Sequence, residues 1–152
     1  MGMITLRGPQ IAELAVLSGL CLRSKAHWGY DAQFMAACVE ELTLTPDELS
    51  TTDVAVAETE GQVIGLVQIA VEDAVADLLK LFVDPTHMGK GAGRILMEWA
   101  IVTARAKGAR DMTIEADPDA APFYRAMGAV LVGSAPSESI PGRHLPLLRL
   151  AL

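Results

Sequence analysis

The sequence has few of the features that mark a nucleic-acid-binding, secreted or membrane-spanning protein. Its 12 Lys and Arg are outnumbered by 19 Asp and Glu, and no basic run forms the patch expected of a DNA- or RNA-binding protein. The two cysteines, Cys21 and Cys38, lack the spacing of metal ligands, so no metal site is expected. Apolar runs such as residues 12–22 are interrupted and too short to span a bilayer. Without an apolar signal segment at residues 1–7, we expect a reduced, cytoplasmic protein with no membrane partner.

The composition instead favours one globular unit. A chain of 152 residues suits a single domain, residues 1–152, with a sizeable core. No internal repeat, low-complexity tract or linker divides it. Its hydrophobic fraction of 51% is high for a small protein, which suggests that some apolar surface is covered by a second copy. We therefore expect a homodimer.

Hydrophobic periodicity and turn residues predict alternating strands and helices. Strands are expected at residues 4–7, 54–57, 62–71, 76–83, 111–116, 130–133 and 145–152. Helices are expected at residues 9–22, after a cap at Asp31, briefly at 46–48, and at 91–107 and 118–127. The helix at 91–107 is expected to pack on the sheet through one face, made of Ile95, Trp99, Val102 and Ala106.

The most informative segment is residues 78–97, where a buried strand leads through a Val-Asp-Pro stop into a glycine-rich turn and a helix. The first N–H groups of a helix have no partner inside it, and the helix dipole adds partial positive charge there. Gly89, Gly91 and Gly93 let a bulky anion approach the backbone, while Lys90 and Arg94 add charge nearby. The segment therefore predicts a phosphate-binding turn.

Two common phosphate motifs do not fit this turn. A Walker A loop requires Gly-Lys-Ser/Thr, but Gly91 follows Lys90. A dinucleotide fingerprint requires a further small residue where Arg94 and Leu96 stand. The stretch Met-Gly-Lys-Gly-Ala-Gly-Arg at residues 88–94 instead resembles the acetyl-CoA pyrophosphate loop of the GNAT superfamily of N-acyltransferases, Arg/Gln-x-x-Gly-x-Gly/Ala. Met88 departs from it by removing one polar contact.

A second motif strengthens the resemblance. Residues 117–128, Asp-Pro-Asp-Ala-Ala-Pro-Phe-Tyr-Arg-Ala-Met-Gly, are similar to the family signature Asn-x-x-Ala-x-x-Phe-Tyr-x-x-x-Gly-Phe. Asp117 stands at the Asn position, and Ala129 replaces the final Phe. The resemblance covers residues 75–133. It implies an α+β GNAT fold, with a mixed, mostly antiparallel central sheet of about six or seven strands flanked by about four helices.

The resemblance also implies acetyl-CoA as co-substrate. The strand before the glycine turn splays from its neighbour in this family, and the pantetheine arm binds its exposed backbone, here at Leu81, Phe82 and Val83. The side chains of Leu79, Leu81 and Phe82 are expected in the core. The remaining residues matched to the cofactor site are Met88, Gly89, Lys90, Gly91, Ala92, Gly93, Arg94, Asp117, Ala120 and Phe123.

Amide formation from a thioester requires a proton for the departing thiolate and removal of a proton from the attacking amine. Tyr124 matches the general acid of the family; alternatively, it only packs beneath the cofactor beside Phe123. The base stays open, because family members differ. Its candidates are Glu115, Glu72, Asp77 and His27.

Acceptor recognition is expected in residues 24–30 and in the loop at residues 137–144. His27, Trp28 and Tyr30 offer stacking and hydrogen bonds, although Trp28 fits a core position equally well. Arg143 either binds a substrate carboxylate or pairs with a neighbour, and the pairing is slightly favoured. The sequence thus predicts acetylation of a small-molecule primary amine. Acetylation of a protein N-terminus or lysine, and a CoA-binding regulatory module without turnover, stay open as alternatives.

Overall fold

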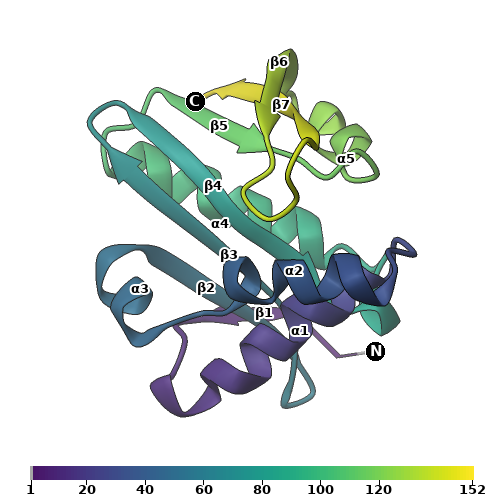
Figure 1. Cartoon of the computed structure of the whole chain (residues 1–152). Helices are drawn as coiled ribbons and strands as arrows, with labels where there is room; N and C mark the ends of the chain where they lie inside the picture. The colour runs from purple at the N-terminus through teal and green to yellow at the C-terminus, as the bar shows by residue number, and fades with distance from the viewer. Residues whose placement is uncertain (1) are drawn as a thin grey trace.

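A computed structural model describes residues 2–152 and shows one seven-stranded sheet with the strand order β1-β2-β3-β4-β5-β7-β6 (Figure 1). Among the described residues, only β4 and β5 pair in parallel, so the expected α+β class and mostly antiparallel sheet are confirmed. The strands are β1 Thr5–Arg7, β2 Asp53–Thr59, β3 Gln62–Glu72, β4 Val75–Val83, β5 Asp111–Glu115, β6 Val130–Pro136 and β7 His144–Ala151. The helices are α1 Leu14–Ala26, α2 Ala32–Leu42, α3 Pro46–Thr51, α4 Ala92–Ala106 and α5 Ala121–Ala126, with 3-10 turns at Ile11–Glu13 and Pro85–His87. Within residues 2–152, no helix has the length and apolar character needed to cross a membrane.

Helices cover both faces of the sheet and divide the core into two parts (Figure 1). On one face, α1 and α2 pack against β2 and β3; this core contains Leu17, Cys21, Cys38, Leu42, Leu44, Val56 and Leu66. On the other face, α4 packs against β2, β3 and β4. Both cysteines are therefore buried apolar side chains and are not paired with each other.

The face through which α4 packs differs from the expected one. Leu96, Met97 and Ala100 are fully buried against the sheet, whereas Val102 is 64% exposed. Apolar residues occupy positions 95–97 and 99–102, so the spacing alone fits more than one buried face. The packed stripe is shifted by one position from the stripe that the periodicity suggested.

Most element boundaries follow from local capping. The side chain of Asp31 accepts a 2.8 Å hydrogen bond from the Phe34 N–H, which confirms it as the cap of α2. The expected turns between β2, β3 and β4 are also present, with left-handed backbone at Glu60, Gly61 and Asp73. The first helix departs from expectation: it begins with a 3-10 turn and extends to Ala26. Part of the acceptor segment is therefore helical.

The central feature of the sheet is a split between β4 and β5. Their parallel ladder joins Val75–Leu78 to residues 111–114 and ends there, while β4 continues beside β3 as far as Val83. The register with β3 also shifts opposite Leu79, which inserts one extra residue into β4. The splayed strand expected from the family resemblance is thus confirmed. It leaves one backbone edge of β4 unpaired beyond Leu78 in the part of the chain that the structure describes.

Candidate functional site

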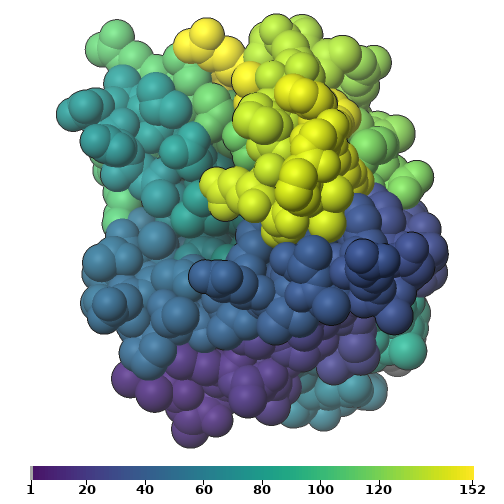
Figure 2. Space-filling view, in the orientation of Figure 1, coloured from purple at the N-terminus to yellow at the C-terminus, as the bar shows by residue number. Residues whose placement is uncertain are grey.

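A cavity of about 650 Å³ fills the split between β4 and β5. Its walls come from α1, α2, α3, β4, the glycine turn, β5, α5 and the loop between β6 and β7. Figure 2 shows a hollow where the teal strands, the blue helix α2 and the yellow β6–β7 loop meet. One continuous space therefore connects the glycine turn with the segments expected to recognise an acceptor.

At one end of the cavity, the N-terminus of α4 is open. Gly89 and Gly91 have φ angles of 77° and 90°, and a Cβ built on either would meet no atom within 4 Å. The first bond from α4 back to the turn joins the Ile95 N–H to the Gly91 carbonyl at 3.1 Å. The preceding N–H groups of α4 thus lack i−4 partners and lie beside the cavity, as an anion site requires.

The side chains near this turn differ in their placement. Met88 and Arg94 line the cavity, and Arg94 forms an i,i+4 ion pair with Glu98 at 3.1 Å. Lys90 is exposed and does not line the cavity. Backbone amides, more than side-chain charges, therefore dominate this end.

The split strand β4 forms the middle of the cavity. Leu81, Phe82 and Val83 are half-buried and line it. Leu81 also packs on the core beneath α4, and Phe82 on the core beneath α1 and α2. Leu79, which was expected in the core, is 47% exposed and lines the cavity, because it stands at an outward position of the β4 alternation, as Val75 and Asp77 do.

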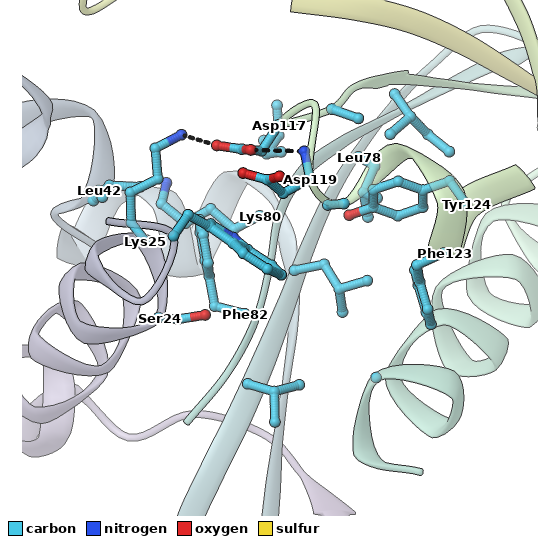
Figure 3. A pocket seen from close by; sticks show the side chains of 18 of the residues that line it. Ser24, Lys25, Leu42, Leu78, Lys80, Phe82, Asp117, Asp119, Phe123 and Tyr124 are labelled. Atoms are coloured by element: carbon cyan, nitrogen blue, oxygen red, sulfur yellow. Dashed lines mark hydrogen bonds and ion pairs between the residues drawn. The ribbon is translucent and has the colours of Figure 1, made fainter. Parts of the chain in front are cut away.

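Tyr124 reaches the cavity from α5. It is only 7% exposed, and its ring packs edge-on against Phe123 with 5.2 Å between centroids. Figure 3 shows the hydroxyl directed into the cavity, and it makes no hydrogen bond within residues 2–152. Burial raises the pKa of the phenol, and the negative charge of Asp117 raises it further. The phenol is therefore protonated at neutral pH and available as a donor.

Asp117, just after β5, is the centre of a polar cluster that sequence reasoning did not foresee. Its carboxylate accepts hydrogen bonds from Tyr30 at 2.5 Å and Lys25 at 3.2 Å, and lies 3.6 Å from the Arg143 guanidinium. Arg143 also donates to the Tyr30 hydroxyl at 2.7 Å, so its expected pairing with a neighbour is confirmed. The cluster ties α1, the α1–α2 segment, the β5–α5 turn and the β6–β7 loop together.

The cluster holds Asp117 in its charged form. Burial alone would raise the pKa of this carboxyl, but hydrogen bonds from Tyr30 and the Asp119 N–H, together with the charge of Lys25, lower it below its usual value. The hydrogen bond between Tyr30 and Asp117 has the opposite effect on the pKa of Tyr30. Burial and the hydrogen bond to Asp117 raise the pKa of Tyr30 to about 12.

Replacing Asp117 with asparagine should destabilise the fold by about 2 kcal/mol at pH 7, because it leaves two largely buried cations without their counter-charge. Since the pKa of Asp117 is lowered on folding, its contribution exists above the unfolded value of about 3.9 and is lost as the pH falls through the folded value. Urea unfolding at pH 7 and pH 3 measures both effects. Asp119→Asn, which changes an exposed neighbour that forms no ion pair within residues 2–152, is the control and should shift stability by less than about 0.5 kcal/mol. Equal losses for both variants would contradict a stabilising role of the cluster.

The remaining residues that were expected to recognise the acceptor differ in whether they line the cavity. Trp28 is 40% exposed and lines the cavity, so it is not a core residue. His27 packs edge-on against Trp28 but lies outside the lining, as do Tyr30 and Arg143. Of the four candidate bases, only Glu115 lines the cavity. Asp77 instead accepts a hydrogen bond from Thr113.

Several polar residues at the acceptor end were missed by sequence reasoning. Lys80, which is 8% exposed on β4, bonds to the Gln68 amide oxygen at 3.0 Å and lies 3.5 Å from Glu48. The sequence did contain a signal for this burial: every second residue of β4 up to Lys80 is buried, and Lys80 falls on one of those positions. The prediction of this strand rested only on its apolar residues. Glu41 and Glu138 line the same end. Burial raises the pKa of Glu115, and the charges of Glu138, Asp77 and Glu41 raise it further.

Comparison with known proteins agrees with this geometry. Residues 50–128 match the family model described as the acetyltransferase (GNAT) domain. The fold is similar to that of the PaiA N-acetyltransferase from Thermoplasma acidophilum in complex with coenzyme A, with 17% identity over 99% of each chain and a TM-score of 0.82. The ribosomal-protein-S18-alanine N-acetyltransferase from Escherichia coli has 17% identity over 98% of this chain and 94% of its own, with a TM-score of 0.73. The protein yncA from Salmonella typhimurium, with its cofactor acetyl-CoA, has 23% identity over 98% and 94%, with a TM-score of 0.69.

Proposed function

The chain belongs to the GNAT acetyltransferase family, and from this premise we propose that it transfers the acetyl group of acetyl-CoA to a primary amine of a small metabolite. One observation carries the proposal. A single cavity joins the open N-terminus of α4, the unpaired edge of β4, the Tyr124 hydroxyl and the Glu115 carboxylate. A phosphate cradle, a strand edge, an acid and a base therefore share one space.

The cofactor fits the phosphate end of this cavity. The space above Gly89 and Gly91, where a Cβ would meet nothing, admits a pyrophosphate to the amides of α4. The backbone of Leu81, Phe82 and Val83, unpaired on the β5 side, can bond the amides of the pantetheine arm as an added strand would. Gly93 lies against Phe123, with 3.6 Å between a Cβ placed there and the ring, so the start of α4 and α5 together form one wall of the cofactor space. The loss of a polar side chain at Met88 leaves this backbone cradle intact.

Acetyl-CoA supplies the thioester carbonyl, and the protein supplies proton transfer on either side of it. Tyr124 is buried, protonated and directed into the cavity, which suits it to protonate the departing thiolate. Glu115 is the candidate base that shares the cavity, and it accepts the amine proton directly or through water. Its raised pKa brings it nearer to neutrality, where a base works best. Free N–H groups of β4 beyond Leu78 are available to stabilise the developing oxyanion.

The closed acceptor side favours a small amine over a protein chain. Ser139 in the β6–β7 loop donates a hydrogen bond to Glu41 of α2, and Arg143 in the same loop bonds to Tyr30 and lies beside Asp117. These contacts draw the loop over the end of the cavity, as Figure 2 shows where it meets α2. A peptide would have to displace them, whereas a small metabolite would not.

Thermal unfolding with acetyl-CoA, ATP or NAD tests the cofactor, because a ligand that binds only the folded state raises the apparent stability. We expect a selective rise with acetyl-CoA, about 2.7 kcal/mol at a concentration a hundredfold above its Kd. Release of free thiol in the presence of amines then tests the reaction. Binding of acetyl-CoA without thiol release from any amine would favour a regulatory module, and no binding would reject the assignment altogether.

A further inference from the structure

The two ends of the cavity carry opposite charge. At the α4 end, the helix amides supply positive potential, and Arg94, which pairs with Glu98, lies beside them. At the other end, the carboxylates Glu41, Glu115 and Glu138 line the wall. The cations at that end are already paired: Lys25 with Asp117 at 3.2 Å and Lys80 with Glu48 at 3.5 Å. The acceptor end is therefore negative overall, in a space whose opposite end suits an anionic cofactor.

A second hollow extends this negative region. It has a volume of about 480 Å³ and is lined by Ala37, Glu40, Glu41, Glu138 and Ser139. Glu41 and Glu138 also line the main cavity, so the two spaces share a wall. None of its three carboxylates has an ion-pair partner among residues 2–152. No group of side chains in the described chain could hold a metal ion, so this charge is not arranged for a metal.

An independent observation marks the shared cavity as a ligand site. Tyr124 is more than nine-tenths buried, yet its hydroxyl is directed into the cavity without a protein partner within residues 2–152. The hydroxyl oxygen itself is accessible from the cavity, so a molecule in the cavity can take the place of a protein partner. A bound reactant would complete the surroundings of this hydroxyl, and Glu41, Glu115 and Glu138 line the same cavity.

Resting on the function proposed above, we propose that the acceptor is a small aliphatic amine with at least one further cationic group. Its reacting amine lies beside Glu115, and its second charge lies against Glu40, Glu41 and Glu138. An amine without a second positive charge would leave these carboxylates without a counter-charge, and a carboxylate on the substrate would be repelled by them. The contact of Ser139 with Glu41 fixes one wall of the second subsite.

Three acceptors of equal length isolate the second charge: butane-1,4-diamine, 4-aminobutan-1-ol and 4-aminobutanoate. With acetyl-CoA, we expect kcat/KM for the diamine to exceed that for the amino alcohol by about tenfold, with the amino acid lowest. The preference should decrease with added salt, because exposed charges are screened. Glu138→Gln combined with Glu40→Gln should reduce it to about threefold. Glu60→Gln, which removes an exposed acid in the β2–β3 turn outside both cavities, is the control and should preserve the preference.

A binding measurement separates this proposal from the proposed function. Calorimetric titration of the protein with CoA present should show about tenfold tighter binding of the diamine than of the amino alcohol, and the Glu138→Gln, Glu40→Gln pair should weaken only that difference. Thiol release from the amino alcohol at a rate equal to the diamine would overturn the dicationic acceptor while leaving the acetyltransferase intact. Absence of turnover with every amine would contradict the proposed function. If no amine is turned over, calorimetry still tests the second cation site. Equal binding of the diamine and the amino alcohol would overturn that site, whereas tighter binding of the diamine that is lost in the Glu138→Gln, Glu40→Gln variant would support it.

Discussion

Gly91→Glu is expected to raise the Kd for acetyl-CoA by at least a hundredfold. The residue is the N-cap of α4, and its Cβ would project into the open space beside the helix amides. Two unit charges about 4 Å apart repel by about 4 kcal/mol at a surface-like dielectric of ~20, which exceeds the ~2.7 kcal/mol that a hundredfold change requires. The added carboxylate would also compete with the pyrophosphate for hydrogen bonds from the N–H groups at the start of α4. Calorimetric titration with acetyl-CoA measures the loss.

The chain offers a closely matched control at the other end of the same helix. Gly108 has a φ of 91° against 90° for Gly91, and a Cβ at either position meets nothing within 4 Å. Gly108→Glu therefore introduces the same backbone strain, about 1 kcal/mol, and the same charge without approaching the cavity. It should retain the affinity of the unaltered protein. If both variants bound acetyl-CoA equally, the pyrophosphate would not lie at the N-terminus of α4.

The parts of the fold that could be predicted are those with local causes. The cap at Asp31, the turns before Gln62 and Val75, and the glycine turn before α4 each follow from a few adjacent residues. The packed face of α4 could not be chosen in the same way. Its apolar residues surround more than half of the helix, and only the sheet against which it packs decides that Leu96 and Ala100 are inside.

The polar clusters of the site could not be predicted from the sequence for a different reason. Asp117 meets Lys25, 92 positions away, and Arg143 meets Tyr30, 113 positions away. Single-sequence patterns carry no information on such pairs, because the fold must first bring the segments together. The motif led us to expect Asp117 among the cofactor-binding residues, and it lines the same cavity as the glycine turn. It did not indicate that an aspartate at the usual Asn position would recruit two cations and a phenol.

Tyr124→Phe is expected to lower kcat by about a hundredfold or more while changing the Kd for CoA by less than about twofold. General acid catalysis contributes typically 10²–10⁴ in rate, and phenylalanine keeps the ring that packs on Phe123. The hydroxyl makes no hydrogen bond within residues 2–152, so its removal should leave the fold intact. Steady-state kinetics with the best amine and calorimetry with CoA measure the two quantities separately.

The pH dependence distinguishes the acid from the base. Because burial raises the pKa of Tyr124, the phenol stays protonated through the neutral range, and activity should not decline there on its account. Activity should instead fall on the acidic side as Glu115 takes up its proton, at a pH above the usual range for a glutamate because its pKa is raised. Glu115→Gln should remove that acidic decline and lower kcat/KM by about tenfold, since water can replace the base in part. If Tyr124→Phe retained full turnover while Glu115→Gln lost it, the thiolate would take its proton from water, and Tyr124 would serve only to pack the cofactor against Phe123.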